Sequence, residues 1–237
     1  MKIAIMSYTG TVGKTTVAAH LLAPRMSRAP VFAIETINET AEGLGIDVSK
    51  IKGERFQELF KELLTLDEAI IDVGASNVEE FLDGMARFED SHLEIDRFIL
   101  PVTSGTKEQK ETMLMVGTLA DFGIPPEKIH LVFNRVDADV KDEFSLVLNY
   151  ARKEGNCSVN TDAAIFENEV FDMLAVRKLT ISAALADETD YKTKLRELGR
   201  DGDPKLKSRY LDMHAIKALA KSVNRNLDTV FSILTTV

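Results

Sequence analysis

Residues 6–17 of the chain read Met-Ser-Tyr-Thr-Gly-Thr-Val-Gly-Lys-Thr-Thr-Val. The segment follows the apolar run Ile3–Met6, which is typical of a buried strand, and precedes apolar residues with helical spacing. A glycine-bearing turn between a strand and a helix lets backbone N–H groups surround an anion, and the start of the helix adds partial positive charge. The order strand, Gly13–Thr16 and helix therefore predicts a phosphate-binding loop.

The residue types in this loop suit a nucleotide and its metal ion. We expect Lys14 to neutralise the β- and γ-phosphates and the hydroxyl of Thr15 to bind Mg²⁺. The alternative is a capped helix after a glycine turn, and the flanking strand and helix favour the phosphate loop. The loop residues that we assign to nucleotide binding are Gly10, Thr11, Val12, Gly13, Lys14, Thr15 and Thr16.

Short apolar runs alternate with helical patterns over the first two thirds of the chain. The runs are nearly continuous, as in strands of a parallel sheet that is buried on both faces. Only helices are predicted from Ile181 onward, where an apolar stripe joins Ile216 to Leu234. We expect one α/β domain over residues 1–237, a mostly parallel sheet covered by helices on both faces, with residues 181–237 as its all-helical part. The expected strands are residues 3–6, 30–34, 68–72, 98–102 and 129–133.

Composition excludes several classes of protein. A chain of 237 residues that is 45% hydrophobic can bury a sizeable core. One cysteine and four histidines give neither a disulfide framework nor a His/Cys metal cluster. The start does not resemble a signal peptide and no apolar run reaches membrane-spanning length, so we expect a soluble cytoplasmic protein. The net charge of −9 opposes nucleic acid, so any DNA contact requires a local basic patch.

An acidic residue ends the third expected strand. Asp72 stands where nucleotide-binding proteins place the acid that holds Mg²⁺ through water. The alternative is that Asp72 caps the helix that begins near Asn77. Given the phosphate loop, we expect the Mg²⁺ role.

The fifth expected strand ends in Asn134-Arg-Val-Asp137. Because a carboxamide both donates and accepts hydrogen bonds, Asn134 could bind an adenine edge. We assign Asn134 and Arg135 to nucleotide binding. The same residues resemble the guanine-recognition motif of GTPases. However, Asp72–Ala75 does not have the Asp-x-x-Gly spacing of a GTPase switch motif. The remaining alternative is a turn, which Asn and Asp favour.

Together, Gly10–Thr16, Asp72 and the segment at Asn134 resemble the ParA/MinD ATPases with a deviant Walker A loop. Leu21–Met26 and Asp72–Asn77 make the chain most similar to the StbB plasmid-stabilisation proteins. The resemblance implies binding of ATP or ADP with Mg²⁺, an ATP-bound homodimer, and a DNA-binding adaptor protein of plasmid origin that stimulates weak hydrolysis. It also implies nonspecific DNA binding in the bacterial cytoplasm, with a role in plasmid stability, positioning or conjugative transfer.

Two segments of the chain depart from this family. Thr9 stands in place of the signature lysine that reaches the partner subunit's phosphates, and threonine cannot supply that charge. After the second strand, Glu35 and Ile37 occupy the places of two aspartates. Glu35 is expected to act near Mg²⁺, whereas Ile37 cannot orient a water molecule. The candidates to replace it are Asn38 and Glu39.

These departures predict slow or partner-dependent ATP hydrolysis, since phosphoryl transfer depends on positioning and charge neutralisation. The expected catalytic residues are Lys14, Asp72 and Glu35. One alternative is a non-hydrolysing scaffold that binds nucleotide and recruits a DNA-binding partner, and another is a metabolic ligase or kinase of the same fold. The candidates to replace the signature lysine are Arg25, Arg87 and Lys107.

Basic side chains gather in residues 192–209, which hold seven basic and three acidic residues. They could touch DNA phosphates, although such a run is more often a solvated helix face. The apolar stripe after it more often packs on its own core than on a membrane, so a membrane partner is not expected. The basic set is Lys192, Lys194, Arg196, Arg200, Lys205, Lys207 and Arg209.

Overall fold

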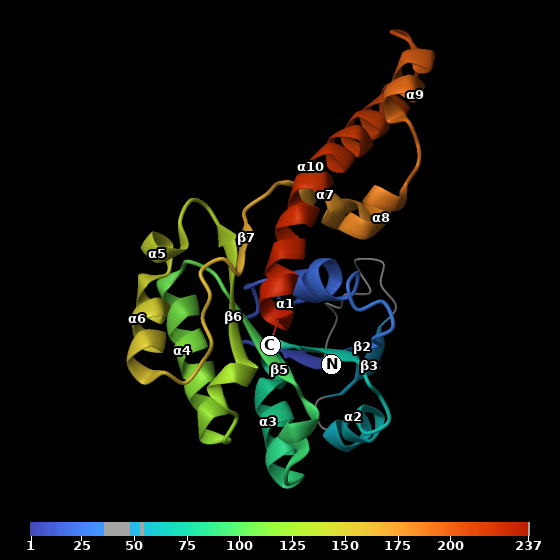
Figure 1. Ribbon diagram of the computed structural model, residues 1–237. Helices are drawn as coiled ribbons and strands as arrows, with labels where there is room; N and C mark the ends of the chain where they lie inside the picture. The colour runs from blue at the N-terminus through green and yellow to red at the C-terminus, as the bar shows by residue number, and fades with distance from the viewer. Residues whose placement is uncertain (36–47, 53–54, 237) are drawn as a thin grey trace.

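The computed structural model describes residues 1–35, 48–52 and 55–236. Within these residues the centre is a seven-stranded sheet in the order β3-β2-β4-β1-β5-β6-β7, and every neighbouring pair is parallel (Figure 1). The strands are β1 Lys2–Ile5, β2 Val31–Ile34, β3 Ser49–Ile51, β4 Ala69–Val73, β5 Arg97–Val102, β6 Ile129–Val136 and β7 Ala164–Phe166.

Helices cover both faces of this sheet. α2 to α6 lie on one face, and α7, α8, α10 and the π-helical segment η1 lie on the other. The helices are α1 Lys14–Thr16, η1 Val17–Leu22, α2 Phe56–Leu63, α3 Val78–Arg87, α4 Thr106–Asp121, α5 Val140–Glu143, α6 Ser145–Glu154, α7 Val170–Arg177, α8 Ile181–Ala186, α9 Tyr191–Leu198 and α10 Pro204–Thr235. Short 3-10 turns in the described part of the chain include η4 Ala75–Asn77, η5 Ser91–Glu94 and η6 Pro126–Lys128.

Successive strand residues point to opposite faces and so feed two separate cores. Ala4 joins the core beneath α2 to α6, whereas Ile3 and Ile5 join the core beneath η1 and α10. All three side chains are fully buried, which explains why the strand runs are continuous in apolar residues. The predicted parallel sheet with helices on both faces and a helical C-terminal region is confirmed.

The two edge strands were not predicted. β3 and β7 have three residues each, too few to show an alternating pattern. The edge at β7 is partly covered, because Asn226 on α10 donates its side-chain N–H to the carbonyl of Ala164 at 2.9 Å. Between β6 and β7, Phe144 separates α5 from α6, and its ring packs on Phe133.

The last helix, α10, spans 32 residues or about 48 Å. Its C-terminal part lies in the core, and its N-terminal part projects from the body beside α9 (Figure 1). Among the described residues, no helix combines the length and apolar character needed to cross a bilayer. The predicted apolar stripe is buried on the protein's own core through Ile216, Ala220, Val223, Leu227, Val230 and Leu234.

Candidate functional site

The loop after β1 is held in one conformation by β6. Gly13 has a φ of 86°, in the left-handed region that favours glycine. Beneath it, Asn134 at the end of β6 donates its side-chain N–H to the carbonyl of Val12 at 2.8 Å. The side chain of Val12 is fully buried, so this residue offers only its backbone to the loop.

Gly13→Ala should lower the free energy of unfolding by about 2 to 4 kcal/mol, measured by urea denaturation. A Cβ at this position would lie 2.3 Å from the Asn134 amide nitrogen, and alanine rarely adopts the left-handed φ. Gly10→Ala is the matched control, because a Cβ there meets nothing within 4 Å. Equal losses in the two variants would contradict the account of the loop.

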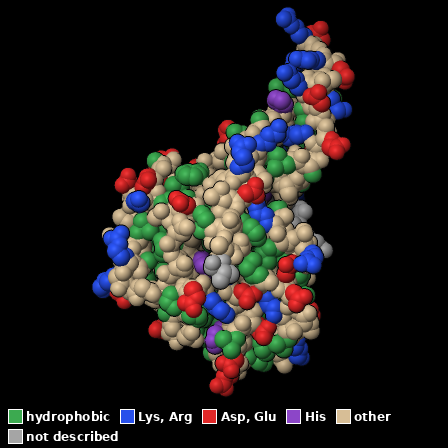
Figure 2. Space-filling model, viewed as in Figure 1, with side chains coloured by type: hydrophobic (Ala, Val, Ile, Leu, Met, Phe, Trp, Pro, Cys, Tyr) green, Lys and Arg blue, Asp and Glu red, His purple; other side chains and the backbone are tan. Residues whose placement is uncertain are grey.

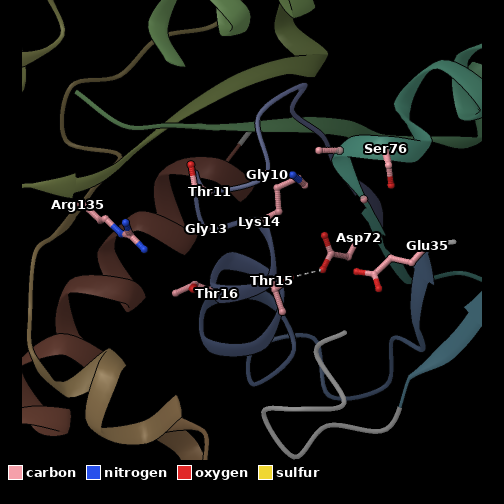
Figure 3. Close-up of a pocket in the computed structure, with 12 residues that line it drawn as sticks. Gly10, Thr11, Gly13, Lys14, Thr15, Thr16, Glu35, Asp72, Ser76 and Arg135 are labelled. Carbon is pink, nitrogen blue, oxygen red and sulfur yellow. Dashed lines mark hydrogen bonds between the residues drawn. The ribbon is translucent and has the colours of Figure 1, made fainter. Parts of the chain in front are cut away.

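A cavity of about 430 Å³ opens beside the loop at the carboxyl ends of β1, β2 and β4 (Figure 3). In an open parallel sheet, ligands bind outside these ends, where the chain changes direction. Every residue that the sequence assigned to the site lines this cavity, except Val12 and Asn134. Gly74, Ala75 and Ser76 line it as well and were not predicted.

Opposite charges are buried together at the floor of the cavity. Lys14 is 6% exposed and donates its ammonium to the carbonyl of Thr9 at 2.9 Å. Burial lowers the pKa of Lys14, while the charges of Asp72 and Glu35 act in the opposite direction. Burial raises the pKa of Asp72, while the hydrogen bond from Thr15 and the charge of Lys14 oppose the rise. Such buried, perturbed groups in a cleft are typical of a functional site.

The predicted metal pair is in contact, since the Thr15 hydroxyl donates to a carboxylate oxygen of Asp72 at 3.1 Å. Within the described residues there is no group of three or more His, Cys, Asp or Glu that could hold a metal alone. Mg²⁺ is commonly held by one or two carboxylates together with phosphate oxygens and water. The pair therefore fits a Mg²⁺ ion that arrives with a polyphosphate.

A second cavity of about 300 Å³ adjoins the first, and Thr16 and Arg135 line both. Its walls include His20, Asn134 and Phe171. Asn134 is 2% exposed and fixed by its bond to the loop. Its amide is therefore held against the loop at the wall of this cavity.

His20 lines the second cavity as a neutral ring. Burial lowers its pKa to about 4, and its Nδ1 accepts the backbone N–H of Ile181 at 3.3 Å. Phe171 packs its ring against it with 5.6 Å between centroids. Sequence reasoning missed this cavity because its walls come from η1, the short β7 and α7, which no local motif links. The additional wall residues are Phe166, Glu167, Asn168, Asp172 and Ala175.

No family model and no curated protein matches the sequence. Solved structures match the fold. MinD from Pyrococcus horikoshii with Mg-ADP superposes over 100% of this chain and 99% of its own, with a TM-score of 0.54 and 18% identity. The chain has the MinD fold. A protein from Borrelia burgdorferi described as a plasmid partition protein, bound to AMPPNP, has a TM-score of 0.50 and 17% identity, covering 91% and 97% of the two chains.

Cyanothece McdA in complex with ATP shares the same fold, with a TM-score of 0.51 and 16% identity over 93% of this chain and 96% of that one.

Within this MinD fold, Thr9 turns toward its own chain. It is 8% exposed and donates its hydroxyl to Glu111 on α4. Lys107 lies one helical turn earlier on α4, with its ammonium 3.7 Å from the Glu111 carboxylate. Of the three candidates to replace the signature lysine, Lys107 is therefore the one near Thr9.

The other two proposed replacements lie elsewhere. Arg25 binds α10 through the backbone and side chain of Asn224 and through Asp228. Arg87 is the last residue of α3. The residues considered for orienting water, Ile37, Asn38 and Glu39, lie outside the described residues.

The predicted basic set lies on α9, on the start of α10 and in the turn between them. In Figure 2, blue Lys and Arg side chains gather on this projection, which we call the arm (residues 190–212). α9 buries none of its residues, and Lys194 lies 5.9 Å from the ring centroid of Tyr210. Lys217, farther along α10, is not part of this basic set, and its ammonium donates to the carbonyls of Asp187 and Thr189.

Proposed function

We propose that this protein is a Mg·ATP-binding switch of the ParA/MinD kind that acts in plasmid stability, positioning or conjugative transfer. The observation that carries the proposal is the cavity in which a glycine loop, the buried Lys14 and the Thr15–Asp72 pair meet. The MinD fold supports it, since MinD from P. horikoshii was solved with Mg-ADP and the B. burgdorferi protein with AMPPNP.

The orientation that we propose for the bound nucleotide follows from the two adjoining cavities. The loop N–H groups and Lys14 would hold the phosphates, with the ammonium turning from Thr9 to the phosphate oxygens. Thr15 and Asp72 would hold Mg²⁺, which supplies charge neutralisation between the β- and γ-phosphates when bound. The base would enter the second cavity beside Asn134, whose carboxamide suits an adenine edge.

Asp72→Asn should remove most of the advantage that Mg²⁺ gives to ATP binding. In the native protein, ATP affinity should be about tenfold to hundredfold higher with Mg²⁺ than with a chelator, because the carboxylate holds the ion through its coordinated water. In the variant the two affinities should be within about threefold. Calorimetric titration measures both, and Asp83→Asn on the exposed face of α3 is the control. An undiminished Mg²⁺ effect in Asp72→Asn would argue against this metal site.

The proposal extends to partners. ATP is expected to produce a homodimer in the bacterial cytoplasm, a DNA-binding adaptor of plasmid origin is expected to stimulate hydrolysis, and the basic arm is expected to touch DNA phosphates near the nucleoid. Seven basic against three acidic residues over 192–209 give the arm a charge opposite to that of the whole molecule.

The test is phosphate release from ATP, with and without DNA, beside sedimentation velocity. Slow release that DNA or adaptor raises, together with ATP-dependent dimers, supports the proposal. Lys14→Ala should abolish both signals. ATP binding that is indifferent to DNA, with no change in oligomeric state, would contradict it.

A second candidate is a non-hydrolysing nucleotide-gated scaffold, and the position of Thr9 favours it. The hydroxyl of Thr9 is committed to Glu111 of the same chain, so this position offers no cation to a partner subunit. Dimerisation with ATP but no phosphate release, even with DNA and adaptor present, would establish the scaffold in place of the ATPase.

A further inference from the structure

The two cavities meet at a single basic side chain. Thr16 and Arg135 are the lining residues that both share. If a ligand places its phosphates in the first cavity and its base in the second, the part that joins them must lie beside these two residues. The part of a nucleotide that joins phosphates to base is the α-phosphate with its ribose.

The backbone places Arg135 at this junction. Its φ is 55°, in the left-handed region that non-glycine residues seldom adopt. The pairing of β6 with β7 shifts register between Asn134 and Val136, and such irregularities re-aim a side chain. Asn134 and Val136 are buried while Arg135 is exposed at the cavity rim. Strained backbone of this kind clusters at ligand-binding sites.

The charge of Arg135 is available to a ligand. Across residues 1–35, 48–52 and 55–236, no acidic side chain forms an ion pair with it. Figure 3 shows Arg135 on one side of the loop, with Asp72 and Glu35 on the other. Apart from Lys14, it is the only Lys or Arg among the described residues that line either cavity.

We propose that Arg135 binds the α-phosphate of a nucleoside di- or triphosphate in cis, as a second cation beside Lys14. The inference rests on the proposed nucleotide site and adds a cation that the loop motif does not contain. A guanidinium presents several N–H donors to phosphate oxygens at once. Because ADP and ATP share the α-phosphate, Arg135 strengthens the binding of both nucleotides. Lys14 and the Thr15–Asp72 pair instead face the distal phosphates.

Three variants separate charge from backbone effects. Arg135→Asn removes the charge but tolerates the left-handed φ, Arg135→Gly removes the strain as well, and Arg135→Lys keeps the charge. We expect Arg135→Asn and Arg135→Gly to bind ADP and ATP about tenfold to hundredfold more weakly, with equal losses for the two nucleotides. Arg135→Lys should recover part of the loss. Inorganic pyrophosphate, which has no α-phosphate and takes the β- and γ-phosphate positions beside Lys14, should bind the native protein and all three variants alike.

A second readout is the melting temperature without ligand. Arg135→Asn and Arg135→Gly should melt at or above the native temperature, because both residues adopt this backbone conformation more readily than arginine. A lower melting temperature together with weaker binding of pyrophosphate would mean that Arg135 only supports the fold, and would overturn the inference. Unchanged ADP affinity in Arg135→Asn would overturn it too, with the proposed function intact. Failure of the native protein to bind ADP or ATP would overturn both.

Discussion

Lys14→Ala should weaken ATP binding by at least about a hundredfold. Lys14 is the cation at the closed end of the cavity, where it is 6% exposed and held against the carbonyl of Thr9. Burial lowers the pKa of Lys14, and the nearby negative charges of Asp72 and Glu35 oppose this decrease. Without the ammonium, the phosphates lose the buried cation of the loop while the negative charges of Asp72 and Glu35 remain near them, so their attraction to the site weakens.

Equilibrium titration with a fluorescent ATP analogue measures this loss, and circular dichroism establishes that the variant is folded. Lys110→Ala, at an exposed position of α4 outside both cavities, is the matched control and should bind as the native protein does. Lys14→Ala that binds ATP within about threefold of the native affinity would contradict the assigned role of the loop.

Arg25→Ala should lower the free energy of unfolding by about 2 to 4 kcal/mol. Its guanidinium is 10% exposed and donates to Asp228, to Asn224 and to the carbonyls of His20 and Leu21. The residue thereby fastens α10 to the end of η1. Truncation removes the donor from the part-buried carbonyls of His20 and Leu21 and from Asn224, and it removes packing between the two helices.

Arg28→Ala is the matched control, three residues later. Arg28 is 87% exposed and its nearest carboxylate, Glu68, is 3.7 Å away, so its loss should change stability by less than about 0.5 kcal/mol. Urea denaturation monitored by circular dichroism compares the two. Similar values for both variants would show that the Arg25 contacts do not hold α10.

Local patterns were sufficient to predict the five inner strands of the sheet, the loop and the buried C-terminal stripe. Each depends on a periodicity or a spacing that is complete within one stretch of chain. Asp72 could be placed near Thr15 from sequence, because parallel strands bring their carboxyl ends to one edge. The structure brings the two into hydrogen-bond contact, as that argument requires.

The rest of the site depends on contacts between distant segments. The second cavity joins His20 to Phe171, 151 positions apart, and no motif connects them. The role of Arg25 in α10 packing spans a separation of 203 residues. Arg135 was assigned to the nucleotide from its place beside Asn134, but its left-handed backbone follows from the register shift with β7, a strand too short to recognise.

Calorimetric titration of the native protein with Mg·ATP, repeated with Mg·ADP and Mg·GTP, tests the central claim most directly. The account predicts saturable binding of ATP and ADP at one site per chain, weaker binding of GTP, and a rise in melting temperature that follows the affinity. The absence of heat and of thermal stabilisation at millimolar Mg·ATP would contradict it, since the loop, the buried lysine and the metal pair would then have no nucleotide to hold.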